Sequence, residues 1–391
     1  MPRVAQAKDA CITRYDNVCV SQIRPGKQRL HFSADRSACD GEACSEHCAL
    51  NHTPWARRCS NPRFPIHEHV LQQSASVWYE PAVALLPSLP TGLLRENMAH
   101  FFYDTLLLEA EIWLRTSGRV SIVLGHSMHS ERPHDLAQEL RRRLFAGSRF
   151  ETPEGGQRCF KELWSYGSAC DRSSRTYGQK SLVARVQLLR SLANYTETPT
   201  SNVVFYARSD TQRRRLLNAR GHFAAVHAMY RNDFRPVFWD DIWSNGQPSV
   251  DEQIHLVRNS ARMISPHGTF TSVWSLFLRP GALVYELTAS CYLYTWLPVP
   301  YLKQPPLSLR HVYLSWRLSD EAKARGWAGP LLELVHPKTG KAQPWTSPWC
   351  CCHGQPRDGD FDLQLPPDEL TRGLGIFDPK HSRRVFKGSE F

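Results

Sequence analysis

Residues 262–287 read RMISPHGTFTSVWSLFLRPGALVYEL and contain one strand–helix–strand pattern. A short apolar run predicts a strand over Arg262–Ser265, and apolar residues at helical spacing predict a helix over Ser272–Leu278. The run Leu283–Leu287 predicts a second strand. A strand followed by a helix and another strand is the repeating unit of parallel sheets.

The same alternation is present closer to the N-terminus. Val203–Ala207 and Val237–Trp239 are predicted strands, and Gln212–Asn218 and Val250–Asn259 are predicted helices. This order indicates an α/β fold with a doubly wound parallel sheet over about residues 200–300. Because ligands of such sheets bind at the carboxyl ends of the strands, we expect the functional residues directly after these strands.

His267 and Gly268 form the predicted turn between the strand Arg262–Ser265 and its helix, and Thr269 follows them. Gly268 lets a ligand approach the backbone, the amide N–H groups at the helix start favour an anion, and His267 offers a donor to a phosphate oxygen. An ordinary strand–helix turn with a solvated histidine is the alternative interpretation.

Arg208 and Ser209 directly follow the first predicted strand, so they are expected at the same edge of the sheet. The planar guanidinium of Arg208 suits phosphate, and Arg213 or Arg214, with Asn218, offers further polar contacts. Two further arginines are expected on a solvated helix face: Arg215 and Arg220.

Glu286 lies at the end of the strand Leu283–Leu287. A carboxylate at this place in a nucleotide-binding sheet accepts ribose hydroxyls, or it forms a salt bridge with a neighbouring arginine.

Asn97, His100 and Asp104 share one face of a predicted helix in the N-terminal half. An imidazole beside a carboxylate suits a general base, so His100 and Asp104 are the candidate catalytic residues. The alternative is a buried structural histidine with Asp104 as its partner.

Two acidic runs, Asp358–Asp362 and Asp240–Asp241, are interpreted as solvated loops. The first resembles a metal-binding run but lies in the C-terminal tail, away from any strand–helix unit. We therefore expect no metal site.

The chain has 391 residues and a formal net charge of +11, which favours anionic partners. The basic residues are spread along the chain and match no zinc finger or RNA-recognition signature, so we expect a nucleotide-sized anion and no nucleic acid. No apolar run is long enough to span a bilayer.

Six of the twelve cysteines fall in the first 59 residues, and their spacing favours a disulfide framework over a zinc site. Sequons at Asn51 and Asn194 also favour a secretory lumen. Met1–Asp9 has no apolar signal-peptide core. Either the protein is cytosolic and the sequons are accidental, or a membrane anchor is missing from the N-terminus, and we expect the second.

Several segments, in this order, resemble glycosyltransferase family 61, in particular its EGF-domain-specific O-linked N-acetylglucosamine transferase branch. They cover roughly residues 91–290 and are Glu96–Asp104, Arg158–Glu162, Tyr206–Ser209, Arg214–Asn218, Glu252–Gln253, Pro266–Gly268 and Phe277–Leu287. One departure lies after Gly268, where Thr269-Phe270 replaces the small residues usual in the family.

The resemblance implies two Rossmann-like lobes of GT-B type, an inverting mechanism, a UDP-sugar donor and no divalent metal or other cofactor. The sugar is then GlcNAc or a pentose, and the acceptor is a protein or glycan hydroxyl in the Golgi or endoplasmic reticulum. The expected parts are a Cys-rich N-terminal region (1–75), an acceptor-side lobe (76–197), a nucleotide-sugar lobe (198–345) and a C-terminal tail (346–391).

Two alternatives remain at this stage. The first is a lumenal binding protein that keeps the fold but has lost catalysis, because the bulky Phe270 stands where the family usually has a small residue. A metal-dependent transferase that uses the Asp358–Asp362 run is the second.

Overall fold

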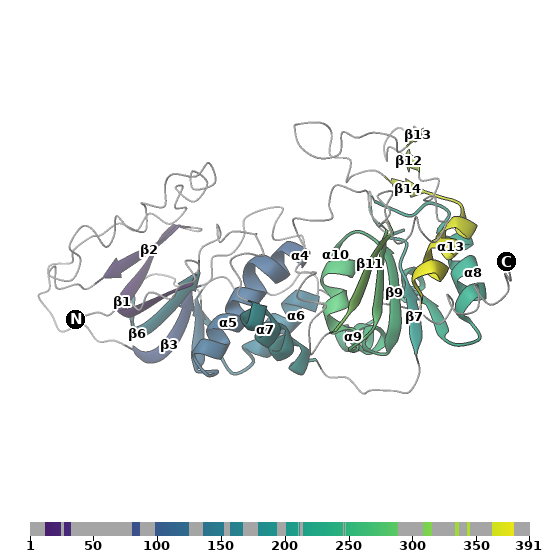
Figure 1. Cartoon of the computed structure of the whole chain (residues 1–391). Helices are drawn as coiled ribbons and strands as arrows, with labels where there is room; N and C mark the ends of the chain where they lie inside the picture. The colour runs from purple at the N-terminus through teal and green to yellow at the C-terminus, as the bar shows by residue number, and fades with distance from the viewer. Residues whose placement is uncertain are drawn as a thin grey trace, which may run out of the picture. The chain divides into compact units, whose positions relative to one another are not determined.

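The chain divides into two compact units, Met1–Leu192 and Ala193–Phe391. The computed structural model (Figure 1) describes residues 12–24, 27–32, 80–86, 98–124, 136–151, 157–166, 179–193, 201–209, 211, 214–244, 246, 248–287, 308–314, 333–335, 342–344 and 362–378. Both sequons, the Cys350–Cys352 cluster and Arg213 lie outside these residues.

The first unit contains a six-stranded sheet with the order β2-β1-β6-β3-β4-β5. The neighbours from β6 to β5 are parallel, whereas β1 is antiparallel to both β6 and β2. The strands are β1 (Ile12–Arg24), β2 (Lys27–Phe32), β3 (Glu80–Leu86), β4 (Val120–Leu124), β5 (Arg149–Glu151) and β6 (Gln157–Tyr166).

The described part of residues 1–75 differs from the sequence-based prediction. Residues 1 to about 75 are rich in cysteine and poor in periodicity, which predicts loops held by cross-links. The described part instead contains the strands β1 and β2, and β1 pairs with β6 over most of its length. Polar residues interrupt the apolar pattern of β1, so its strand character comes from main-chain pairing with a distant partner. Cys19 of β1 lies directly opposite Cys159 of β6, and Cys159 is disulfide-bonded.

The helices of the first unit are joined by buried ion pairs. The Glu109 carboxylate receives two hydrogen bonds from the Arg141 guanidinium, at 2.7 and 2.9 Å, and Glu111 receives one from Arg185 at 2.6 Å. These contacts tie one helix, α5, to α6 and α7. The helical elements are α4 (Met98–Phe101), a π-helical turn (Phe102–Leu106), α5 (Leu107–Arg115), α6 (Leu136–Leu144) and α7 (Gln179–Ser191).

The second unit contains the parallel sheet that the sequence predicts. Its order is β11-β10-β9-β7-β8, and every neighbouring pair is parallel. The strands are β7 (Asn202–Phe205), β8 (Arg235–Phe238), β9 (Ser260–Pro266), β10 (Leu283–Leu287) and β11 (Arg310–Leu314). The chain moves from β7 outward to β8 and then crosses to the other side of β7 for β9. The strand order therefore reverses between β7 and β9, which is the switch point where ligands of such sheets bind.

Helices cover both faces of this sheet (Figure 1). On one face, Val203 and Phe205 of β7 pack with Val226 of α8 (Ala219–Tyr230) and with Leu370 and Leu374 of α13. α9 and α10 lie on the opposite face. The remaining elements are a 3-10 turn (Trp239–Asp241), α9 (Val250–Arg258), α10 (Thr269–Ser272), a second 3-10 turn (Trp274–Phe277), β12 (Glu333–Val335), β13 (Ala342–Pro344), β14 (Asp362–Gln364) and α13 (Pro367–Phe377).

α9 shows why the sequence prediction works where its signals are local. Ser249 accepts a hydrogen bond from the backbone of Glu252, and the Glu252 carboxylate accepts one from the Ser249 amide. This capping box satisfies two amides that a helix start leaves without an internal acceptor. The helix ends at Arg258, close to the predicted end at Asn259.

The predicted helix Gln212–Asn218 is wrong for its described residues, since α8 begins only at Ala219. Arg214 and Asn218 have left-handed backbones, with φ of 58° and 57°, which no α-helix contains. Leu216 instead forms a parallel bridge with Leu363 of β14. A partner about 150 residues away in the sequence thus decides the conformation of this loop.

The C-terminal residues 362–378 belong to the second unit, which corrects the expectation that Asp362 lies in a tail away from the strands and helices. The Asp378 carboxylate pairs with the guanidinium of Arg262 on β9 at 2.7 Å and accepts a hydrogen bond from the Tyr230 hydroxyl at 3.0 Å. The side chains of Arg262 and Asp378 are buried. This pair fixes the end of α13 against the sheet.

Candidate functional site

Arg208 follows β7 at the switch point and has a left-handed backbone, with φ of 62°. Asp240, in the turn after β8, holds this conformation from both sides. Its carboxylate accepts the amide N–H of Ala207 at 2.9 Å and that of Ser209 at 2.7 Å. A non-glycine residue in this backbone region is strained, and such strain persists only where surrounding contacts determine it. Asp240 supplies those contacts.

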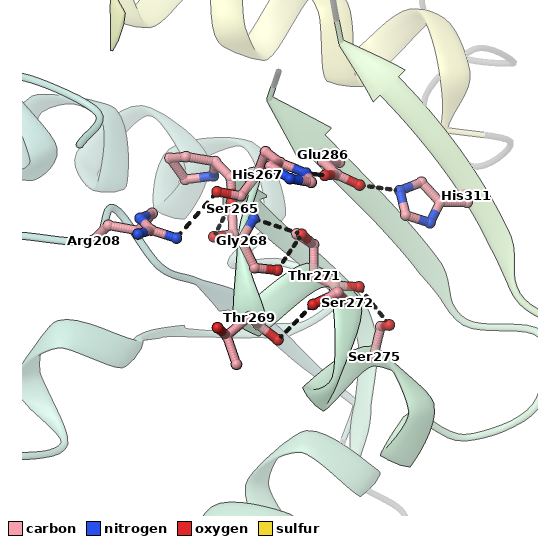
Figure 2. Close-up of polar contacts among 11 residues, drawn as sticks. Arg208, Ser265, His267, Gly268, Thr269, Thr271, Ser272, Ser275, Glu286 and His311 are labelled. Carbon is pink, nitrogen blue, oxygen red and sulfur yellow. Dashed lines mark hydrogen bonds and ion pairs between the residues drawn. The ribbon is translucent and has the colours of Figure 1, made fainter. Parts of the chain in front are cut away.

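The Arg208 side chain crosses to the turn after β9 (Figure 2). Its Nη1 donates a hydrogen bond to the His267 carbonyl oxygen at 3.1 Å. A Cβ atom added to Gly268 would lie 1.7 Å from the same Nη1, so only a glycine leaves room for the guanidinium. The sequence predicts that Arg208 and His267 lie at one edge of the sheet, and the structure confirms that they are in contact.

The Glu286 carboxylate lies between two imidazole rings (Figure 2). One oxygen pairs with Nδ1 of His267, and the other is 2.6 Å from Nε2 of His311 on β11. Glu286 is fully buried, and burial alone would raise the pKa of its carboxyl. The charge and hydrogen bond of His267, with the hydrogen bond of His311, instead lower that pKa to about 2.

This geometry does not match either role expected for Glu286. A ribose hydroxyl needs an accessible carboxylate oxygen, but both oxygens already contact histidines in a buried environment. The partners are also histidines rather than an arginine. The carboxylate is therefore placed to orient His267, whose side chain remains 14% exposed.

Hydroxyl groups hold the turn from Gly268 into α10. The Thr271 hydroxyl accepts the Gly268 amide at 3.2 Å and lies 3.1 Å from the Gly268 carbonyl oxygen, and the Ser275 hydroxyl donates to the Thr271 carbonyl at 2.6 Å.

α10 has only four residues, and a 3-10 turn follows it, so the predicted single helix Ser272–Leu278 is wrong.

Phe270 does not fill the site. Its ring lies 4.9 Å from that of Tyr206 and 4.7 Å from that of Trp239, and it is 3% exposed. The ring is thus part of an aromatic cluster beneath the turn. Because the ring is packed inside the fold, the bulk of Phe270 is no longer a reason to suspect a blocked donor site.

The loop between β7 and α8 is held by a second carboxylate, Asp362. This residue accepts the Arg215 amide at 2.9 Å and the Arg215 guanidinium at 2.6 and 3.0 Å. The expected helix face for Arg215 is wrong because α8 begins only at Ala219. The expected solvated loop for Asp362 is wrong because this residue is 1% exposed. Arg220 is exposed as expected and pairs with Asp241.

The predicted site residues fall into three groups. Arg208, Ser209, His267, Gly268, Thr269 and Glu286 come together at the strand ends of the second unit. Arg214 and Asn218 belong to the loop after β7, and the Asn218 side chain lies against Gly221. His100 in α4 and Asp104 in the π-helical turn belong to the first unit; their side chains, and all of Asn97, lie outside the described residues.

The sequence analysis missed two contributors to the site, Asp240 and His311. Asp240 was interpreted as a solvated acid, although its position directly after a predicted strand was a usable signal. His311 follows a stretch with no strong pattern, and its partner Glu286 lies 25 residues earlier in the sequence.

Among the described residues, no three His, Cys, Asp or Glu side chains are grouped as a metal site requires. In that same part of the chain, no helix has the length and apolarity that crossing a membrane requires.

The segment 98–285 matches the family model described as Glycosyltransferase 61. This match contains the β7, β8 and β9 strand ends with Arg208, Asp240 and His267. Residues 98–285, 188 of the 391 in the chain, thus have the sequence pattern of glycosyltransferase family 61. No curated protein sequence matches it. The family 61 match ends one residue before Glu286, so Glu286, His311 and the C-terminal residues that hold the Arg215 loop lie outside it.

Proposed function

We propose that this chain is a member of family 61 and transfers a sugar from a UDP-sugar to a hydroxyl group, with inversion at the anomeric carbon and without a divalent metal. One observation carries the proposal: Arg208 and His267 are in contact beside Gly268, at the switch point of a parallel sheet. A guanidinium at this place is complementary to a diphosphate.

The chemistry requires compensation of the charge on the leaving group. The acceptor oxygen attacks the anomeric carbon while the bond from that carbon to the diphosphate oxygen breaks, and the acceptor proton passes to a base. Negative charge grows on the diphosphate, and preorganised cationic groups such as the Arg208 guanidinium stabilise it. His267, oriented by Glu286, supplies a second contact. We assign the base or acceptor-positioning role to His100 or Asp104 of the first unit.

The substrate classes follow from the family resemblance. The donor sugar is GlcNAc or a pentose, and the acceptor is a protein hydroxyl, as in the EGF-domain-specific branch, or a glycan hydroxyl. A binding protein without catalysis is less well supported, because Phe270 is packed inside the fold rather than in the donor position.

We place the protein in the lumen of the secretory pathway. The disulfide bond of Cys159 supports this location, because disulfides persist in oxidising compartments. We further propose that Cys19 is its partner, since the two residues are directly opposite in the β1–β6 pair.

The test is sugar transfer and UDP-sugar hydrolysis by the purified protein, with and without EDTA. Turnover that persists in EDTA, and is lost in both Arg208→Ala and His267→Ala with unchanged melting temperatures, supports the proposal. Arg220→Ala is the matched control, because this exposed arginine pairs with Asp241 and lies over the Phe238 ring. Donor binding without turnover indicates the binding protein, and loss of turnover in EDTA indicates a metal-dependent enzyme.

A further inference from the structure

The turn after β8 places a carboxylate beside the loop that carries Arg208. In the strand order β11-β10-β9-β7-β8, β8 is the neighbour of β7 on the side away from β9. Asp240 follows β8 and Arg208 follows β7, so both residues lie at the edge of the sheet where ligands bind. The hydrogen bonds from the amides of Ala207 and Ser209 to Asp240 show that the two loops are in contact.

The Asp240 carboxylate keeps acceptor capacity after it has bound the backbone. Oδ2 accepts the Ala207 amide and Oδ1 accepts the Ser209 amide, whereas each carboxylate oxygen has about two lone-pair positions. Asp240 is half-buried, so part of the residue is open to solvent. A hydroxyl group of a ligand can therefore donate to it, but a phosphate oxygen, which only accepts, cannot.

The other carboxylates near these strand ends are already engaged. Glu286 on β10 is fully buried, and both of its oxygens contact histidine rings. Asp241, the residue after Asp240, pairs with the exposed Arg220 guanidinium. Recognition of a ligand hydroxyl on the β8 side of the site therefore falls to Asp240.

A nucleoside diphosphate carries both kinds of group that this edge recognises. Its phosphates are complementary to the Arg208 guanidinium, and its ribose offers hydroxyl donors a few bonds away. In doubly wound sheets, a carboxylate at the end of the strand beside the phosphate-binding loop accepts ribose hydroxyls. The positions of Arg208 after β7 and Asp240 after β8 match that arrangement.

We propose that Asp240 accepts a ribose hydroxyl of the donor nucleotide and so makes the site selective for a ribonucleoside diphosphate over a deoxyribonucleotide or a bare diphosphate. The inference rests on the proposed function, because it needs a UDP-sugar as donor. The nucleoside then extends over β8 rather than over β10. The same carboxylate holds the Arg208 loop through the two amides and binds the ribose through its remaining lone pairs.

The test compares the affinities of the full chain for UDP, 2′-deoxy-UDP, 3′-deoxy-UDP and inorganic pyrophosphate by calorimetric titration. Because a hydrogen bond to a charged group is stronger than a neutral one, removal of the bound hydroxyl should raise Kd at least about tenfold. Pyrophosphate should bind more weakly than UDP. Kd values equal to that of UDP for both deoxy nucleotides in the wild type overturn the inference, and this readout needs no variant to fold.

Variants then separate the ribose contact from the support of the Arg208 loop. Asp240→Ala also releases that loop and should weaken binding of every ligand, so the deciding quantity is the ratio of the Kd of the deoxy nucleotide to the Kd of UDP. We expect this ratio to fall to about one in Asp240→Ala and to keep its wild-type value in Arg208→Ala, which removes a phosphate contact alone.

A second variant and a neighbouring control complete the design. Asp240→Asn keeps one acceptor oxygen without the charge, so its ratio should lie between that of Asp240→Ala and that of wild type. Asp241→Ala should keep the wild-type ratio. A wild-type ratio in both Asp240 variants overturns the inference and leaves Asp240 as a support of the loop alone.

The outcomes also separate this inference from the proposed function. A wild type that transfers sugar from a UDP-sugar but binds UDP and both deoxy nucleotides equally contradicts only the ribose contact. A wild type that prefers UDP in the expected way but transfers no sugar contradicts the enzymatic function, and the ribose contact is then supported by itself.

Discussion

The Asp240 carboxylate accepts the Ser209 amide at 2.7 Å, and through this contact the turn after β8 determines the backbone of the loop after β7. The same carboxylate also accepts the amide of Ala207, so Asp240 binds the backbone directly before and directly after Arg208. The loop that presents the guanidinium is thus held by a residue on the neighbouring strand end.

Replacing Asp240 with Ala should therefore release Arg208 from its strained backbone. Two charge-assisted hydrogen bonds are lost, each worth about 1.5–3 kcal/mol, so UDP affinity should fall by roughly tenfold or more. Calorimetric titration with UDP measures this. Asp241→Ala is the neighbouring control, because Asp241 pairs with the exposed Arg220. Equal losses in the two variants would contradict a specific role for Asp240.

Gly268→Ala should reduce both function and stability. The new Cβ would meet Arg208 Nη1 at 1.7 Å, and this atom is the end of a flexible side chain that can move away. The backbone of Gly268, with φ of 159° and ψ of −161°, is a conformation that only glycine adopts readily, so the variant is also strained. We expect a loss of activity comparable to that of Arg208→Ala and a melting temperature below that of wild type. Gly147→Ala, whose Cβ would meet nothing within 4 Å, is the control. Full activity in Gly268→Ala would show that the guanidinium is not needed where it lies.

Glu286 should make the stability depend on acid. Its pKa in the fold is about 2, below the ordinary value of 4.5, so its ionised form contributes stability above about pH 4.5. That contribution is lost as the pH falls from about 4.5 to 2. Glu286→Gln should therefore melt below wild type at pH 7, and the gap should narrow in acid. Melting curves at several pH values measure the gap; a gap that stays constant would contradict the ionised state.

Asp362→Asn should weaken the loop from the C-terminal side. The variant loses the charge that pairs with Arg215, and because Asp362 is buried we expect a cost of about 1–3 kcal/mol in the free energy of unfolding. Denaturant unfolding measures this cost, and UDP titration shows whether the loop also matters for the donor. Asp368→Asn, at an exposed position in the first turn of α13, is the control.

The proposed Cys19–Cys159 bond can be mapped directly. Digestion without reductant should release the two cysteines in one linked peptide, and Cys19→Ser should free the thiol of Cys159. Loss of such a bond typically costs about 2–4 kcal/mol, so this variant should also melt earlier. A linked peptide that joins Cys159 to another cysteine would contradict the assignment.

The sequence was informative where signals are local. Apolar runs predict the strands and apolar residues at helical spacing predict α9, and parallel strands necessarily bring Arg208 and His267 to one edge. It failed where a distant partner decides the structure. The loop around Leu216 is not helical because β14 pairs with it, and β1 is a strand because β6 does.

The functional role of a buried carboxylate is equally hidden from the sequence. Glu286 was correctly placed at the end of a strand, but its partners are set by the pairing of β9, β10 and β11. No spacing pattern in the sequence predicts that His311 lies beside Glu286.

The anchoring of α13 by Asp378 determines how the second unit can be prepared as a recombinant fragment. A fragment limited to the family-matched segment would lack α13, which packs on Val203 and Phe205. It would also lack Asp378, the counter-ion of the buried Arg262 guanidinium. Such a truncation would expose apolar surface that is buried in the full chain and would favour aggregation into inclusion bodies. A soluble fragment of the second unit must extend at least through Asp378.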